Sequence, residues 1–494
     1  MIIKSNPGHV DAERIVLFPF DDHGLPFRQG VRLHLVGFKT PVDRTRIVVP
    51  LGPPGAPDSK RVIYYGTVLR VGGELWMWYL GQGDDDHWQQ RVCLATSRDG
   101  YTWEKPDLGL VEYQGSRHNN LVDMLGGEHS IVACVVFHDP DDPDPERRFK
   151  AVIETKDRPR LFGVLFSGDG LRWREFDVGP GAPQCEPSGG TKFNGCYLLS
   201  AHGGSHFGAP RQLVTYLSYD FEHWIEASCL GLRRDDIPPR PYRDTFAGGE
   251  QVHLGAALWN RGNVIVGLYG QWHGPGNNDR RHVDMDLGLV VSNDGLHYTE
   301  PIPDFPMVAA AEDGMNHLPR PWNFKHAALA QGQGFENIGD ETLFWYAPWP
   351  EQLSDGVRVA TWQRDRLGYL QPFDERKLLV PGGCHVISAP IDLGGRPARV
   401  SLNVDGLSEY AQVTVEVLDE RFRPVAGYSA DECPPLESGL TQPVAWRSRQ
   451  LVDGAVGSIR IRVNYTGIRP EDPRLYAIYV DPAGAPCRAG VAGR

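Results

Sequence analysis

The same seven-residue pattern is written four times, as SRDGYTW at 97–103, SGDGLRW at 167–173, SYDFEHW at 218–224 and SNDGLHY at 292–298. A degenerate fifth copy, QRDRLGY, stands at 363–369. Segments rich in Val, Ile, Tyr, Phe and Trp precede each copy, and turns such as Asn-Gly and Gly-Gly join them. Each unit therefore supplies about four short strands. Repeated four-stranded units are typical of a β-propeller.

The heptad itself is best explained as turn chemistry. Its Asp-Gly pair suits a tight turn between the third and fourth strands of a unit. The Trp or Tyr that ends it has the size and amphipathic character to fill the space between neighbouring blades. Five copies therefore predict five blades, and no catalytic role is expected for the heptad. The first strands of the blades are expected near 63–70, 130–137, 188–193, 252–259 and 327–336.

The pattern changes from Pro390, where alternating strands continue without the heptad. This alternation over about 100 residues is typical of two sheets packed face to face. We therefore expect an all-β chain, made of a five-bladed β-propeller followed by a β-sandwich. The expected division is an N-terminal extension packing on the propeller (1–60), a catalytic propeller (61–385) and a C-terminal sandwich (386–485).

Composition excludes several classes of protein. The 494 residues carry a net charge of −13 with both signs interspersed, so neither nucleic acid nor a membrane surface is an expected partner. No apolar run approaches the ~20 residues that span a bilayer, and the N-terminus lacks a basic segment followed by an apolar one. The eight cysteines contain no CxxC pair, which favours buried thiols. We expect a cytoplasmic protein, and a homo-oligomer is compatible with the sequence.

Propeller geometry sorts the polar residues between the two ends of the channel. Strands alternate in direction, so the starts of the first strands and the loops between second and third strands share one end. The acidic run DPDDPD at 139–144 falls in a hairpin at the opposite end. At the shared end, acids, histidines and tryptophans collect, which is what a sugar site requires: carboxylates for acid–base chemistry and indoles to stack on the sugar.

Glu186 and Glu250 are the two candidate catalytic residues. Each stands just before a first strand, in the contexts QCEP and GGEQ, and the Gly and Pro flanks allow the backbone to approach the channel closely. In a crowded, partly dry mouth one carboxyl would act as general acid. The other would stay ionised, as a nucleophile or as a base for water.

Other residues at this end are candidates for binding sugar hydroxyls and the sugar ring. They open first strands, start third strands or lie in the loops between second and third strands. They are His129, His326, Asp86, Asp286, His253, Trp88 and His273.

No motif indicates a cofactor. There is no H-x-H or HExxH spacing for a metal, no GxSxG elbow for a nucleophilic serine, and no Gly-rich loop followed by a helix for phosphate. We expect neither a cofactor nor a protein-bound metal, with a structural or channel cation as the one alternative left open.

Several stretches resemble uncharacterised bacterial proteins related to family 32 and family 43 glycoside hydrolases. They include YGTVLRVGGELWMWY from Tyr65, GEQVHLGAALWNRGNVIVGLYGQWHG at 249–274 and DLGLVVSNDGLHYTEPIP at 286–303. The resemblance implies a five-bladed propeller with a C-terminal sandwich and glycosidase activity. It also implies three acids on inner strands, but no acid stands near 63–66, where the first should be, and Asp139 falls in a hairpin. Only Glu186 and Glu250 stand where the resemblance places acids on inner strands.

Three functions follow from these observations. The first is a glycoside hydrolase or transglycosidase acting on a small furanoside or related glycoside. The second is a non-catalytic carbohydrate-binding propeller, and the third is a sugar lyase or epimerase that uses Glu and His as acid and base. A second carboxylate at the correct spacing favours the first, an aromatic mouth with one acid favours the second, and a His–Tyr or metal-centred pocket favours the third.

Overall fold

The computed structural model describes residues 10–39, 47–84, 89–127, 129–156, 162–178, 185–203, 211–234, 250–273, 283–312, 328–349, 355–454 and 457–486. Within these ranges the chain is almost entirely β-structure, so the all-β prediction is confirmed. The α-helix that they contain is one turn, α1 (Glu375–Leu378). Short 3₁₀ turns occur at Leu125–Gly127, Pro145–Arg147, Ala310–Glu312 and Ala430–Glu432.

Three four-stranded sheets follow one another along the chain, each with its strands in sequence order and antiparallel. The earliest contains β8 (Ile131–His138), β9 (Phe149–Thr155), β10 (Phe162–Ser167) and β11 (Arg174–Phe176). The next contains β12 (Glu186–Phe193), β13 (Cys196–Gly203), β14 (Gln212–Ser218) and β15 (Cys229–Leu232). The last contains β16 (Gln251–Asn260), β17 (Ile265–His273), β18 (Asp284–Ser292) and β19 (Pro306–Val308).

The units before and after these three share one sheet. Its first part contains β5 (Arg61–Val71), β6 (Glu74–Gln82) and β7 (Arg91–Ser97). Its second part contains β20 (Leu329–Ile338), β21 (Glu341–Pro348), β22 (Gly356–Gln363) and β4 (Ile47–Pro50). A parallel pairing of β20 with β5 joins the two parts, so the beginning and the end of the repeat meet and no edge is left between them.

The first strands of the five units form a closed ring. Contacts run from β5 to β8, β12, β16 and β20, and from β20 back to β5. Every one of these strands has a register shift in its pairing with the second strand of its unit. Polar side chains cross the ring: Gln333 Oε1 accepts from Leu258 N at 2.7 Å, and its Nε2 donates to Leu258 O at 2.6 Å. The five-bladed propeller stays a prediction, and this ring supports it.

The heptads form the turns that the sequence predicts. Ser97 Oγ accepts from Gly100 N at 2.9 Å, and Asp99 Oδ1 accepts from the next backbone amides. Gly100 has a φ of 75°, which glycine adopts without strain. Its carbonyl accepts from Trp103 of the same heptad and from Trp345 of the last unit, both at 3.0 Å. The heptad is therefore a turn whose tryptophan packs between units.

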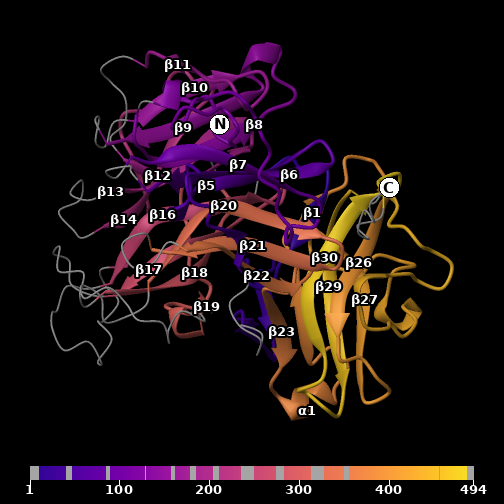
Figure 1. Ribbon diagram of the computed structural model, residues 1–494. Helices are drawn as coiled ribbons and strands as arrows, with labels where there is room; N and C mark the ends of the chain where they lie inside the picture. Colours follow the sequence, from indigo (N-terminus) through magenta and orange to yellow (C-terminus); the bar gives the residue numbers. More distant parts are fainter. Residues whose placement is uncertain are drawn as a thin grey trace.

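Two further sheets contain the C-terminal strands, and N-terminal strands complete them (Figure 1). One sheet has β28 (Gly439–Pro443), β26 (Ala398–Asp405), β30 (Arg474–Pro482), β23 (Gly368–Pro372) and β3 (Val31–Leu35), with β1 (Ile15–Leu17) on β30. The other has β2 (Phe27–Gln29), β24 (Cys384–Ile387), β29 (Ser458–Gly467) and β25 (Ile391–Asp392), with β27 (Ala411–Asp419) on β29. Alternate residues, such as Val400, Leu402, Val413 and Val415, form the buried core between the sheets.

The first 60 residues, expected as an extension packing on the propeller, supply strands to three sheets. Strands β1, β2 and β3 hydrogen-bond within the two C-terminal sheets, while β4 is the outer strand beside β22. An edge strand gains backbone hydrogen bonds when a distant segment adds to it, and no local sequence signal shows which edge is left open. The division at 61–385 and 386–485 stays a prediction.

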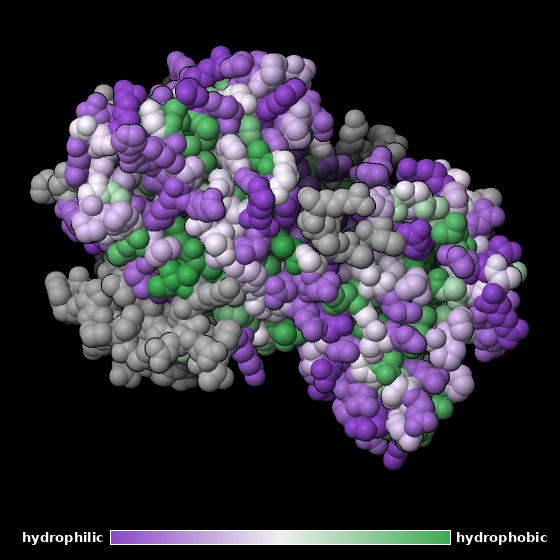
Figure 2. Space-filling model, turned by 45° about the vertical axis from the view of Figure 1, so that its right-hand side comes forward, coloured by the Kyte–Doolittle hydropathy of each residue, from purple (hydrophilic) through white to green (hydrophobic). Residues whose placement is uncertain are grey.

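The outer surface is polar, as the composition implies. Figure 2 shows hydrophilic residues over most of the described surface on the face drawn, with apolar residues in small groups between them. Within the described ranges, no helix has the length and apolar character to cross a membrane.

A buried ion pair connects the repeat units to the C-terminal sheets. Asp365 is 1% exposed and accepts from Arg261 Nη1 at 2.5 Å, from Asn337 Nδ2 at 2.9 Å and from the Tyr479 hydroxyl at 2.8 Å. Burial alone would raise the pKa of Asp365, but the Arg261 guanidinium and these hydrogen bonds lower it well below its ordinary value. The ionised carboxylate therefore stabilises the junction.

We expect Asp365→Asn to lower the free energy of unfolding by about 2 kcal/mol at pH 7, because a charged hydrogen-bond acceptor is lost. A depressed folded-state pKa stabilises the fold above the unfolded-state value of about 4, and this stabilisation disappears as pH falls below it. The difference between wild type and variant in urea unfolding should therefore shrink between pH 5 and about pH 2. A difference that is constant with pH would contradict the assignment.

Candidate active site

Glu186 lies at the end of the ring where the first strands begin. It is the first residue of β12, and its side chain is 33% exposed. His202 lies opposite it on β13, with Nε2 at 3.4 Å from Glu186 Oε2. Glu186 is therefore a carboxylate that a ligand can reach, with a histidine as its neighbour.

The backbone of β16 fixes how His202 carries its proton. The amide of Leu254 donates to His202 Nδ1 at 3.2 Å, so the neutral ring carries its hydrogen on Nε2, toward Glu186. Leu254 has a φ of 60°, which is uncommon for a residue with a side chain, and it lies in the bulge between His253 and Ala256. The bulge thus points an amide at the histidine and orients the His202–Glu186 pair.

Aromatic rings pack beside this pair. The His253 ring centroid lies 6.5 Å from that of His202, 6.2 Å from Tyr65, 5.7 Å from Trp272 and 5.5 Å from Trp349. His253 and both tryptophans are at most 5% exposed, so the rings hold one another in place. The half-buried Tyr65 is the member of this group with ring surface left for a sugar to contact.

Glu250 lies in a separate, buried cluster. Its side chain is 1% exposed and hydrogen-bonds to Nδ1 of His273, which is fully buried. The other ring nitrogen of His273 lies 3.3 Å from Asp286 Oδ2. The hydrogen bond to Glu250 fixes the orientation of the His273 ring, and Asp286 places a second carboxylate beside the other ring nitrogen.

Arg234 supplies a positive charge to this cluster of carboxylates. It follows β15, has no exposed side-chain surface, and places its guanidinium 3.0 Å from Glu300 Oε1, 2.7 Å from Asp304 Oδ1 and 3.7 Å from Glu250 Oε2. Burial by itself lowers the pKa of Arg234, but the Tyr269 hydroxyl, Glu300 and Asp304 raise it above its ordinary value. The guanidinium therefore stays charged and balances the surrounding carboxylates.

Three of these side chains offer metal-ligating atoms. Glu250 Oε2, His273 Nδ1 and Asp304 Oδ1 lie within 4.8 Å of one another, and nitrogen and carboxylate donors suit zinc or manganese. However, Arg234 Nη2 already lies 2.7 Å from the same oxygen of Asp304. The positive charge that a metal would bring is thus supplied by the guanidinium, and the structure gives no reason to add a cation.

The structure brings some of the sequence-predicted residues together and separates others. Glu250, His273 and Asp286 share the buried cluster. The His253 ring packs near the ring of His202, which in turn contacts Glu186. His129 lies elsewhere, in a small cavity between the first two units beside Arg91 and Met124. Residues Asp86, Trp88 and His326 lie outside the described residues. The catalytic and binding roles stay predictions.

Sequence reasoning places His202 at the same end of the channel as Glu186 without giving it a role, and it does not select Arg234 or Asp304. For His202 a signal existed: counting outward from the Asn194-Gly195 turn places Glu186 within one residue of it. For Arg234 and Asp304 no local pattern was available, because their partners come from different units.

Similar solved structures are glycoside hydrolase-like proteins. A glycosyl hydrolase from Bacteroides ovatus is 15% identical with a TM-score of 0.46, covering 69% of this chain and 98% of that one. A protein of the GH130 family, described as mannoside phosphorylases that include hydrolases of β-1,2-mannosidic linkages, is 13% identical with a TM-score of 0.43, covering 67% and 95%. A thermostable family-43 glycoside hydrolase is 10% identical with a TM-score of 0.39, covering 63% and 92%.

At these identities and TM-scores the similarity decides neither the fold nor the activity of this chain. No protein-family model matches the sequence, and no curated protein matches it. The function must therefore be argued from the residues themselves.

Proposed function

We propose that the chain is a glycoside-cleaving enzyme on a five-bladed propeller, acting on a small carbohydrate where the first strands begin. The observation that carries the proposal is the Glu186–His202 pair: an accessible carboxylate, an oriented histidine and a floor of packed rings. A carboxyl group that gives and takes a proton beside an aromatic surface is what cleavage of a glycosidic bond needs.

The two glutamates take different roles in this proposal. Glu186 is accessible, so it exchanges the proton with the glycosidic oxygen or with water. Glu250 is 1% exposed and contacts His273 and Arg234, which favour its ionised form. It would act as the second carboxylate only if the substrate reaches it, and otherwise its charge orders His273 and Asp286.

The remaining parts of the proposal follow the sequence. Relatedness to family 32 and family 43 enzymes and a furanoside or similar substrate are proposed from the resemblance of its stretches. A cytoplasmic location is proposed too, and it is in keeping with the unpaired state of the seven described cysteines.

A panel of 4-nitrophenyl furanosides and pyranosides tests the activity. Wild-type protein should release nitrophenol from at least one of them, and ¹H NMR of the first-formed anomer should show retention or inversion. If the wild-type protein binds glycosides but cleaves none of them, no more than Glu186→Gln does, the enzyme proposal fails.

One observation favours a second candidate. Glu186 is the carboxylate that the described contacts place beside these rings, and an aromatic mouth with one accessible acid also suits a carbohydrate-binding propeller. Binding without turnover would favour that function. The His253–Tyr65 proximity also suits a lyase or epimerase, and solvent deuterium entering the sugar ring without hydrolysis would indicate that chemistry.

We expect His202→Leu to lower kcat about tenfold with KM nearly unchanged, because the substitution removes the donor that orients Glu186. His202→Gln, which can still donate to Glu186, should recover most of the loss. Steady-state kinetics on the best 4-nitrophenyl glycoside measures both. Equal losses in the two variants would mean that the hydrogen bond is not the cause.

A further inference from the structure

A cavity with polar and apolar lining lies on the first unit, and neither Glu186 nor His202 lines it. Its volume is about 250 Å³, and it is lined by residues from the segments 53–58, 105–107 and 113–120. None of the residues of the Glu186 pair or of the Glu250 cluster lines it. Pockets for drug-sized ligands measure about 300–1,000 Å³, so this one suits a molecule of about one ring.

A buried hydrogen-bond network forms the floor of this cavity. The Asn120 amide donates to the Tyr79 hydroxyl and to Leu94 O, both at 2.8 Å. The Tyr79 hydroxyl donates to Asp58 Oδ2 at 2.7 Å, and Lys105 Nζ donates to the same oxygen at 2.5 Å. Asp58, Tyr79 and Asn120 are at most 5% exposed, and burial raises the pKa of Tyr79 well above its ordinary value. These hydrogen bonds therefore fix the side chains of the floor in place.

The network leaves one acceptor of a cavity-lining residue, Asn120, unused. Both amide hydrogens of Asn120 are used, and Leu94 O, which can only accept, fixes which side of the amide is the nitrogen. Within the described part of the chain, no donor reaches the Asn120 amide oxygen, although the residue is 95% buried and lines the cavity. An amide oxygen that solvent can reach accepts from hydroxyl groups as it does from water, so a hydroxyl-bearing ligand can bind there.

The rim adds donors, acceptors and apolar surface. His118 Nδ1 lies 2.8 Å from Asp107 Oδ2, and both side chains are exposed. Hydrogen bonding to Asp107 raises the pKa of His118. Two acids, Asp58 and Asp107, thus face two bases, Lys105 and His118, so the cavity is close to neutral. Prolines, Tyr113 and small or uncharged polar residues supply the rest of the lining.

We propose that this cavity binds one ring of a neutral, polyhydroxylated ligand, such as a single sugar unit. Hydroxyl groups would donate to the Asn120 amide oxygen and exchange hydrogen bonds with Asp107 and His118, while the ring lies against proline and tyrosine carbons. The proposal stands on this cavity alone and does not require the chain to cleave glycosides.

Saturation-transfer NMR with methyl glycosides of glucose, galactose, mannose, xylose and arabinose tests it on the full chain. Ala56→Trp fills the cavity from its half-buried wall and leaves the hydrogen bonds of the floor in place. We expect at least one glycoside to give a saturable signal whose Kd rises tenfold or more in Ala56→Trp. The double variant Asp107→Ala with His118→Ala should also raise the Kd.

Two controls separate this cavity from other sites. His223 forms the same exposed pair with Asp220, also at 2.8 Å, on another unit, so His223→Ala should leave the signal unchanged. Glu186→Gln should leave it unchanged as well. The proposal is overturned if no methyl glycoside gives a saturable signal, if Ala56→Trp has no effect, or if Glu186→Gln abolishes the signal that Ala56→Trp reduces.

Discussion

Glu186→Gln is expected to reduce kcat/KM on the best 4-nitrophenyl glycoside by about 10²–10⁴-fold, the usual contribution of a positioned acid–base group. Glutamine preserves the shape of the side chain and its contact with His202, but it cannot transfer the proton. The side chain is one-third exposed, so little burial energy changes, and the variant should unfold at nearly the wild-type urea concentration.

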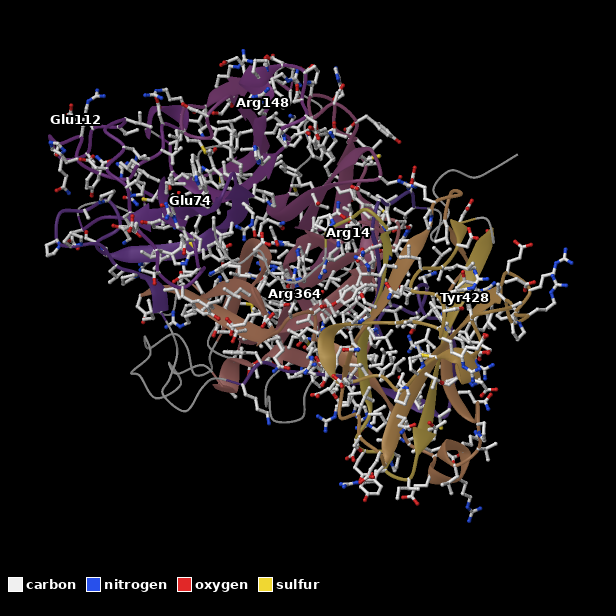
Figure 3. All side chains as sticks on the ribbon, turned by 90° about the vertical axis from the view of Figure 1, so that its right-hand side faces the viewer. Arg14, Glu74, Glu112, Arg148, Arg364 and Tyr428 are labelled. Carbon is white, nitrogen blue, oxygen red and sulfur yellow. The ribbon has the colours of Figure 1, made fainter. Side chains whose placement is uncertain are left out.

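The control for this loss is a glutamate of similar chemistry far from the pair. Glu112 is exposed at the periphery of the molecule, as Figure 3 shows, so Glu112→Gln should keep wild-type kinetics. A leaving group with a high pKa should show a larger effect of Glu186→Gln than nitrophenol does, because it depends more on protonation. If Glu186→Gln keeps near-wild-type turnover while folded, Glu186 is not the acid–base residue.

The parts of the fold that the sequence predicts are those with local causes. Each of the four full heptads contains its own turn: in the first, Ser97 and Asp99 accept from amides within three residues, and Gly100 takes the left-handed conformation. The alternation of β-rich segments and turns is equally local. For this reason the order of strands within each unit could be predicted without knowing how the units pack.

The parts that could not be predicted depend on distant segments. Strand β4 at 47–50 pairs with β22 near 356, although nothing in its four residues indicates that partner. The same holds for the site: Glu186 begins one first strand and Glu250 directly precedes another, yet Glu186 is partly exposed and Glu250 is buried beneath Arg234 and His273. Which of two equivalent positions faces solvent is decided by the neighbouring unit, not by the strand itself.

Replacing Arg234 with methionine is expected to lower the free energy of unfolding by about 3–5 kcal/mol, the usual cost of leaving buried charges uncompensated. Arg234 is fully buried and contacts carboxylate oxygens of Glu300 and Asp304 at 3.0 and 2.7 Å. Methionine fills a similar volume, so the loss should come from charge and hydrogen bonds and not from a cavity. Urea unfolding followed by tryptophan fluorescence measures it.

The origin of the loss can be separated from a packing defect. Adding Glu300→Gln and Asp304→Asn to Arg234→Met removes the uncompensated charges, so the triple variant should recover part of the stability. Asparagine is suited to position 304, whose φ is 57°. Arg98→Met, which breaks the exposed pair with Glu74, should cost at most about 1 kcal/mol. If the triple variant is less stable than Arg234→Met alone, charge balance is not what Arg234 contributes, and the carboxylates are held by their hydrogen bonds instead.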